Sequence, residues 1–156
     1  MVMFDYFVGE LKCPVCSLVS PADSSTGMQT KIREEPNLEY LRIGDCLEIS
    51  QEGAEDVYYL TVNAPEVDKA IRIIEMWTCP SCRSANWAHI FVEANIITQV
   101  STVEKLPKVL EEASFISEEC LTEEARFRGI EEAEFRGMND TQFSLSKLLT
   151  ILLKKL

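Results

Sequence analysis

The sequence has little positive charge. Only 15 basic residues stand against 26 acidic ones, which gives a net charge of −11, and there is a single histidine. A field of this sign repels nucleic-acid phosphates, so we expect no nucleic-acid partner. The chain also lacks an apolar run of about 18 residues, so no membrane-spanning helix is expected. Its start shows no secretory signal, and we therefore expect a cytoplasmic protein with reduced thiols.

Motifs of the common enzyme classes are also missing. The sequence contains no phosphate-binding loop of the Gly-x-x-x-x-Gly-Lys type and no Gly-x-Gly-x-x-Gly fingerprint. A serine–histidine–aspartate triad would have to use His89, and no nucleophile-elbow motif accompanies it. Acidic pairs are frequent, but neighbouring carboxylates on one helix do not converge on one substrate bond. We predict that the protein is not an enzyme.

Two short motifs of the form Cys-Pro-x-Cys, at residues 13–16 and 79–82, are the most informative feature that is present. Zinc prefers four soft thiolates in a tetrahedron, and a Cys-x-x-Cys turn places two sulfurs at neighbouring corners. The proline presets the turn. The pattern predicts one structural Zn²⁺ whose closed shell leaves no position for a substrate. The predicted ligands are Cys13, Cys16, Cys79 and Cys82.

Other uses of these cysteines stay open on the sequence alone. Iron also occupies four-thiolate sites, and it would make the protein an electron carrier or a metal-dependent enzyme. Redox dithiols need a thioredoxin-like βαβ setting, which is not evident here. We expect His89 near the site or on the surface rather than as a ligand. Four further residues receive structural interpretations: Trp77 and Trp87 as shields of the metal, and Cys46 and Cys120 as buried apolar residues.

The two motifs resemble those of the zinc-ribbon superfamily, in which each cysteine knuckle tops a β-hairpin. The usual family pattern is Cys-Pro-x-Cys-Gly, whereas this chain has Ser17 and Arg83 in place of the glycines. A left-handed backbone at those positions would carry a small strain. The resemblance covers the knuckles and their flanking strands, and it implies an antiparallel sheet closed at one end by the metal.

The pattern of apolar residues predicts an α+β fold. We expect strands over residues 4–12, 41–49, 57–62, 70–78 and 87–100, the last turning near 93–95, and a loop over 17–37. Helical spacing predicts one helix over about 106–120, a second from Thr122, and a third capped by Asp140. The predicted architecture is an elaborated antiparallel zinc-ribbon sheet in residues 1–103. Two or three C-terminal helices in residues 104–156 pack on it, as one domain overall.

Residues 104–140 contain eleven acidic and five basic residues. One interpretation is a solvated helical face. The other is an acidic surface that covers the basic cleft of a partner, with phenylalanines as apolar anchors. The predicted partner-binding residues are Glu111, Glu112, Glu118, Glu119, Glu123, Glu124, Phe127, Glu131, Glu132 and Phe135.

Small size, acidity, the missing catalytic set and a metal-clamped scaffold make the chain similar in general character to bacterial immunity proteins. That resemblance implies a non-enzymatic inhibitor that occludes a basic toxin partner. The alternative is a nucleic-acid-associated zinc ribbon, such as a regulator or a transcription accessory protein. The leucine stripe of the last helix is interpreted as core, with a homodimer interface as the alternative.

Overall fold

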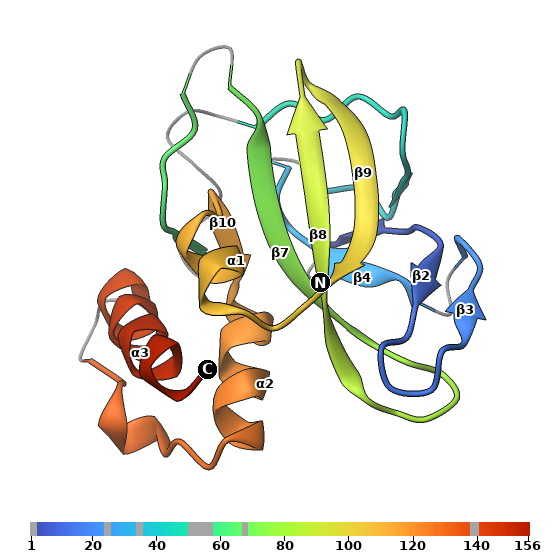
Figure 1. Ribbon diagram of the computed structural model, residues 1–156. Coiled ribbons are helices and arrows are strands. Elements are labelled where there is room, and N and C mark those ends of the chain that lie inside the picture. Colours follow the sequence, from blue (N-terminus) through green and yellow to red (C-terminus); the bar gives the residue numbers. More distant parts are fainter. Residues whose placement is uncertain (1–2, 24–25, 34–35, 50–57, 67–68, 138–140) are drawn as a thin grey trace.

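A computed structural model describes residues 3–23, 26–33, 36–49, 58–66, 69–137 and 141–156. The elements within these ranges form three sheets and a helical region (Figure 1), which confirms the predicted α+β class. Two of the strand pairs are parallel, β1 with β5 and β7 with β10, so two of the three sheets are mixed, and the third, β2 with β3, is antiparallel.

The largest sheet has five strands in the order β6-β10-β7-β8-β9. Its strands are β6 (Tyr59–Thr61), β10 (Phe115–Ser117), β7 (Ile71–Thr78), β8 (Ala85–Glu93) and β9 (Ile96–Val103). The predicted strand over 70–78 and the predicted turn near 93–95 are both confirmed. Ala94 and Asn95 make that turn with positive φ angles of 49° and 62°, as a tight hairpin turn requires.

Two smaller sheets come from the N-terminal part of the chain. The first has the order β4-β1-β5 and the second pairs β2 with β3. Their strands are β1 (Asp5–Phe7), β4 (Met28–Thr30), β5 (Tyr40–Leu41), β2 (Leu11–Lys12) and β3 (Val19–Ser20).

These N-terminal strands correct several predicted bounds. The single strand expected over 4–12 is two short strands in different sheets, and the expected loop over 17–37 contains β3 and β4. In place of the strand expected over 41–49, the structure has only the two-residue strand β5 and an isolated bridge between Cys46 and Ile96. The strand expected over 57–62 is β6, and Val57 lies outside the described residues.

The helical region differs most from expectation. The continuous helix predicted over 106–120 is wrong: α1 (Pro107–Glu111) ends early and β10 follows it. Phe115 and Ile116 are fully buried because β10 lies between β6 and β7. The second helix, α2 (Glu118–Phe127), begins earlier than Thr122, and the Ser117 hydroxyl accepts a hydrogen bond from its Cys120 amide at 3.4 Å.

The last helix, α3 (Thr141–Lys155), follows the short 3₁₀ helix η2 (Glu132–Glu134). The cap predicted at Asp140 lies outside the described residues. Four leucines of the stripe, at positions 145, 148, 149 and 152, are buried, and Leu153 and Leu156 pack half-buried against the same core, which confirms the interpretation of the stripe as core. A contact between two copies through this helix would have to use its other face. Among the described residues, no helix combines the length and apolarity needed to span a bilayer.

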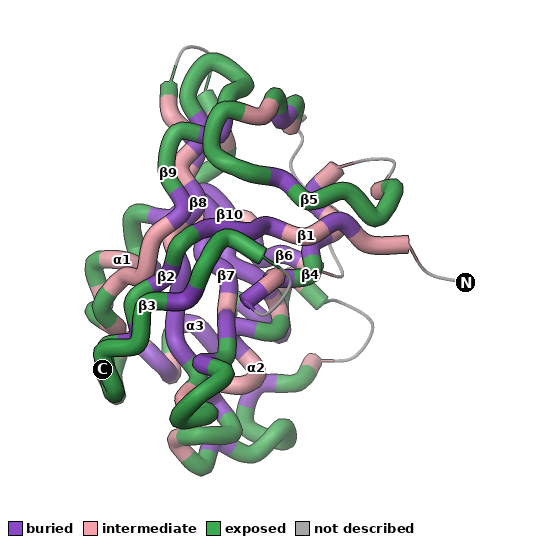
Figure 2. Tube along the Cα trace, turned by 90° about the vertical axis from the view of Figure 1, so that its right-hand side faces the viewer, coloured by how far each residue is buried: buried purple, intermediate pink, exposed green. Residues whose placement is uncertain are grey.

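The five-stranded sheet separates two apolar cores. Ile73 and Trp77 of β7 pack toward the N-terminal strands, whereas Ile74 and Trp87 pack toward the helices. Alternate residues of a strand point to opposite faces, so β7 is buried on both sides. The molecule is therefore layered: small sheets, then the large sheet, then helices (Figures 1 and 2).

Candidate metal centre

The two cysteine knuckles have the same backbone geometry. In the first, the amide of Ser17 donates to the carbonyl of Cys13 at 3.0 Å, and in the second Arg83 donates to Cys79, also at 3.0 Å. Ser17 and Arg83 have positive φ angles of 66° and 64°. The left-handed backbone expected at these two positions is thus confirmed.

Each knuckle also tops a β-hairpin, as the zinc-ribbon resemblance implies. The first lies between β2 and β3, which pair through Leu11 and Ser20, and the second joins β7 to β8. Thr102 on β9 donates from its hydroxyl to the carbonyl of Lys12 at 2.9 Å. This bond holds the first hairpin against the large sheet, which carries the second.

The four cysteine sulfurs converge at the tip of the two hairpins. The Sγ atoms of Cys13, Cys16, Cys79 and Cys82 all lie within 4.8 Å of one another. Two contacts between the knuckles, Cys13 to Cys82 and Cys16 to Cys79, are each 3.6 Å long. A tetrahedron with metal–sulfur bonds of about 2.3 Å has an edge of about 3.8 Å. The cluster therefore fits a four-thiolate metal ion.

Ser84 and Asn86 support these sulfurs from β8 and the turn before it. The Ser84 hydroxyl lies 3.3 Å from the Cys13 sulfur and 3.1 Å from the Cys82 sulfur. The buried Asn86 amide donates to the Ser84 hydroxyl at 3.1 Å and orients it. Donors of this kind stabilise thiolates and fix the ligand geometry. Ser84 contacts Cys82 locally, two positions along the chain, whereas only the fold brings Ser84 and Asn86 to the Cys13 sulfur.

The thiols of the cluster differ in acidity. Burial opposes ionisation of Cys13, but hydrogen bonds from Ser84 and two backbone amides outweigh it and lower its pKa. Ser84 likewise lowers the pKa of Cys82. An amide at Leu18 favours the Cys16 thiolate, but burial and the neighbouring sulfurs raise the pKa of Cys16 overall. Four thiolates at this spacing repel one another, and a divalent cation removes that repulsion.

Three aromatic residues expected near the metal, His89, Trp77 and Trp87, lie in different parts of the fold. His89 lies on β8, half-buried against Phe91, and is not part of the cluster. Its pKa is lowered by burial and by the charge of Arg72. Trp77 shares a core cluster with Cys13 and Cys79, whereas Trp87 belongs to the other core and does not shield the sulfurs.

The two cysteines outside the cluster also differ. Cys120 is buried as expected, but Cys46 is exposed, so the interpretation of Cys46 as a core residue is wrong. Its isolated bridge to Ile96 places it beside the turn between β8 and β9.

Two of the predicted partner-binding residues are not on the surface. Phe135 is 3% exposed and packs in the helical core, so it cannot be an anchor. Glu124 is 4% exposed, and both Lys105 and Arg128 donate to its carboxylate at 2.8 Å. Lone charges are not buried without partners, so this triad explains how Glu124 enters the core.

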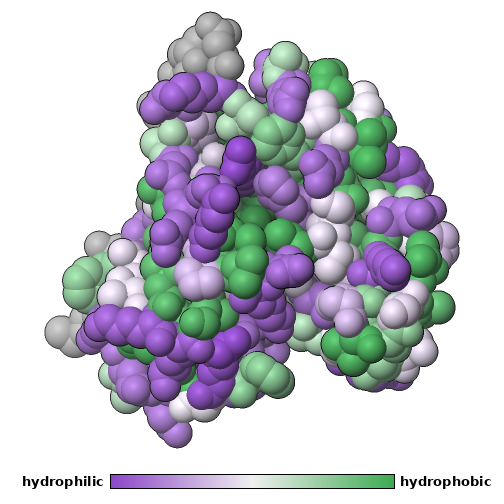
Figure 3. Space-filling view, viewed as in Figure 1, coloured by the Kyte–Doolittle hydropathy of each residue, from purple (hydrophilic) through white to green (hydrophobic). Residues whose placement is uncertain are grey.

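The other predicted residues lie on or near the surface. Phe127 is 79% exposed, and the Lys105 ammonium lies 5.3 Å from the centre of its ring. Figure 3 shows hydrophilic side chains over much of the helical part of the face seen there. The exposed or half-buried acidic residues are Glu111, Glu112, Glu118, Glu119, Glu123, Glu131 and Glu132.

Two of these carboxyl groups, Glu118 and Glu119, have raised pKa values. Burial, and then the charge of Glu119, raise the pKa of Glu118. Burial, and then Glu123, raise the pKa of Glu119. Neither Glu118 nor Glu119 forms a salt bridge within the described ranges, whereas Glu123 pairs with Arg126 on its own helix. The charge of Arg136 partly offsets that of Glu118, but among the described residues no salt bridge neutralises the carboxylates at the start of α2.

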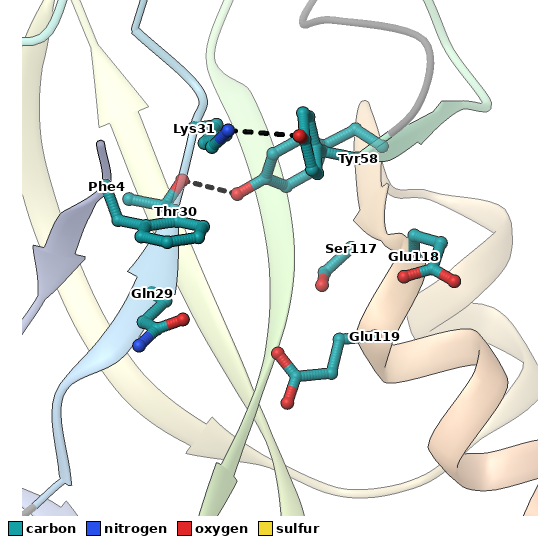
Figure 4. Close-up of a pocket in the computed structure, with 9 residues that line it drawn as sticks. Phe4, Gln29, Thr30, Lys31, Tyr58, Ser117, Glu118 and Glu119 are labelled. Carbon is teal, nitrogen blue, oxygen red and sulfur yellow. Dashed lines mark hydrogen bonds between the residues drawn. The ribbon is translucent and has the colours of Figure 1, made fainter. Parts of the chain in front are cut away.

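A pocket separates the start of α2 from β4 (Figure 4). Lys31 donates to the Tyr58 hydroxyl at 3.0 Å and lies over the Tyr58 ring, 4.4 Å from its centre. At the back of the pocket, the Tyr59 hydroxyl donates to the buried carboxyl of Glu75 and bonds to the Thr30 hydroxyl. No sequence motif signals this chain of hydroxyls, which links the small sheet to the large one.

Comparisons with known proteins give no relative for this arrangement. No protein-family model matches the chain, and neither the curated proteins nor the solved structures contain a significant match. The likeness to zinc ribbons therefore rests on the two knuckles alone.

Proposed function

We propose that the protein is a non-enzymatic zinc-binding protein that binds a basic protein partner through its acidic surface. Its most fitting role is that of an immunity-type inhibitor, which neutralises a toxin by covering its active site. Zinc is the proposed ion because four thiolates close a tetrahedral shell around it and leave no open position. In this role the ion braces the scaffold rather than reacting with a substrate.

The observation that supports the partner proposal is the pair of carboxylates at the start of α2, whose raised pKa values reflect burial and neighbouring negative charge. Glu118 and Glu119 lie close together without a salt bridge in the described part of the chain. Like charges held together destabilise a free protein, and a lysine or arginine of a partner relieves that cost. The net charge of −11 adds long-range attraction for a basic surface and speeds the encounter.

A pull-down with the tagged full chain from its native cells tests the partner proposal. We expect a basic protein to be recovered at low salt and less of it at moderate salt, because the attraction is screened. Adding the purified chain to that protein should inhibit its activity in proportion to occupancy. Recovery of no protein at either salt would contradict the proposal, and recovery of nucleic acid would favour the regulator alternative.

The structural role of the metal has a separate test. Cys79→Ser should remove one ligand, release the ion and unfold much of the sheet, because metal-binding free energy is folding free energy here. Far-UV circular dichroism and thermal melting measure this loss. Cys46→Ser is the matched control, since Cys46 is exposed and outside the cluster. Equal melting of both variants and the wild type would show that the site is peripheral.

A further inference from the structure

Two adjoining cavities form a groove between β4 and the start of α2, with β7 as its floor. The larger measures about 300 Å³ and the smaller about 90 Å³, and Gln29 and Glu119 line both. We propose that an extended basic segment of the partner lies in this groove as an added strand on β4. This inference rests on the proposed function, because it locates the contact with the basic partner.

The free edge of β4 is the first support. Among the described residues, β4 is the outer strand of its sheet, and it pairs with β1 in an antiparallel register that sets Gln29 opposite Tyr6. On its other side β1 pairs with β5, and there the amides of Tyr6 and Val8 donate to the carbonyls of Glu39 and Leu41.

The register then fixes the direction of the Gln29 backbone. Along a strand of an antiparallel pair, the amide and the carbonyl of one residue both point to the same side. Those of the next residue both point to the opposite side. Because Tyr6 bonds to the strand on its far side, the pair of Tyr6 and Gln29 exchanges no hydrogen bonds. The backbone amide and carbonyl of Gln29 therefore point away from β1, toward the groove that Gln29 lines. Such an unpaired edge is where an extended peptide adds to a sheet.

Two buried polar atoms in the groove wall are the second support. Trp77 Nε1 and Thr26 Oγ1 have no hydrogen-bond partner in the described part of the molecule. Their residues are only 2% and 3% exposed, and both line the larger cavity. Buried polar groups in folded proteins are normally paired. A peptide offers the carbonyl acceptor that an indole N–H requires, along with the amide that the Gln29 carbonyl requires.

Charge complementarity selects a basic segment. Glu119 extends toward the space between α2 and β4, and Glu118 lies beside it on α2 (Figure 4). Lys31, the cation on the opposite wall, is already held by Tyr58 and by the ring of Phe4, 4.9 Å from its centre. A lysine or arginine of the added strand would supply the missing positive charge. Phosphate-bearing ligands are disfavoured by the same two carboxylates.

A labelled short peptide of alternating lysine and valine, titrated against the full chain, tests the groove by fluorescence anisotropy. We expect Glu118→Gln with Glu119→Gln to weaken binding by about tenfold or more. Glu48→Gln with Glu93→Gln is the matched control, because it removes the same charge at two exposed positions that do not line the groove, and it should change binding by less than about twofold. Equal weakening by both pairs, or no binding at all, would overturn the inference.

Backbone pairing has its own readout. Methylation of alternate peptide amides should weaken binding about tenfold if the peptide pairs with β4, and exchange of the Gln29 amide hydrogen should slow when the unmethylated peptide binds. Unchanged exchange at Gln29, or equal affinity for the methylated peptide, would overturn strand addition. If the native partner still binds the Glu118→Gln, Glu119→Gln variant with full affinity, the groove is wrong while the proposed function stands.

Discussion

Ser17 and Arg83 adopt the same left-handed backbone conformation at equivalent ends of the two knuckles, with φ angles of 66° and 64°. Each donates its amide to the carbonyl of the first cysteine of its motif. The turn thus imposes a conformation that only glycine adopts without cost. The two knuckles thus share one backbone geometry without a glycine at the left-handed position.

Replacing these residues by glycine should therefore stabilise the protein. We expect Ser17→Gly and Arg83→Gly each to raise the free energy of unfolding by about 0.5–1 kcal/mol, since relief of left-handed strain exceeds the added freedom of the unfolded chain. Ser81→Gly is the control, because Ser81 is exposed in the same knuckle and has no positive φ. Chemical denaturation of the metal-loaded variants measures the difference. Destabilisation of both target variants would show that the strain is absent.

Removal of the Ser84 hydroxyl should weaken metal binding without abolishing it. Ser84 contacts two of the four sulfurs but is not a ligand. Loss of such a supporting group lowers metal affinity by about 10–100-fold. Competition with a chromophoric chelator should show this for Ser84→Ala and no change for Ser81→Ala. Wild-type affinity in Ser84→Ala would mean that the hydroxyl does not stabilise the thiolates.

The buried carboxyl of Glu75 should make stability fall as the pH rises. Burial, together with the charge of Glu119, raises its pKa from 4.5 to about 8, against the opposing effect of the Tyr59 hydroxyl. Between these two values the folded chain holds a proton that the unfolded chain has released. The stabilising effect is therefore complete below about pH 4.5 and is lost as the pH approaches 8.

Glu75 alone should lower the free energy of unfolding by at most about 1.4 kcal/mol for each pH unit in this range. Glu75→Gln keeps an acceptor for Tyr59 but cannot ionise, so it should lack this slope. Urea denaturation of both proteins between about pH 6 and 8 measures it, and taking the difference cancels protonation of the metal site, which both share. Parallel pH profiles would contradict a neutral Glu75 in the folded protein.

Breaking the ion pair between Asp5 and Arg33 should strongly destabilise the N-terminal sheet. Asp5 is fully buried, and both Arg33 contacts are 2.7 Å long. Burial works against the Asp5 carboxylate, but Arg33 and the amides of Asn37 and Glu39 lower its pKa overall. Arg33→Met should destabilise the protein by about 3 kcal/mol, because it leaves a buried charge without its cation.

A double variant separates the loss of the pair from the cost of the orphaned charge. Adding Asp5→Asn to Arg33→Met should recover part of the stability, since the remaining side chain is neutral. Thermal and chemical denaturation of the single and double variants provide the comparison. A further loss in the double variant would mean that Asp5 does not need Arg33.

The metal centre could be predicted because the information is local. Four cysteines in two identical short motifs specify ligand type, number and spacing, and the structure brings their sulfurs together. The same holds for the hairpin of β8 and β9, whose alternating residues and turn are contiguous in the chain. Ser84 lies only two positions after Cys82, but the motif does not specify a hydroxyl there, and its second contact, with the Cys13 sulfur, spans 71 positions.

The errors in the helical region have a physical cause. Phe115 and Ile116 continue an apolar spacing that fits a helix, yet they form β10 because β6 and β7 offer unpaired strand edges. Long-range pairing overrode local periodicity. The charged neighbours of Glu124 and Phe135 predict a surface position for both residues. Lys105 and Arg128 instead neutralise Glu124 in the interior, and Phe135 packs in the core of the helices.

Metal content is the measurement that bears most directly on this account. Elemental analysis of the freshly purified, reduced full chain should find one zinc ion per molecule in a colourless protein, and iron only in traces. Preparations that are folded yet free of metal would contradict the claim that an ion joins the two knuckles and stabilises the fold. A stoichiometric, coloured iron centre would instead contradict the assignment of zinc.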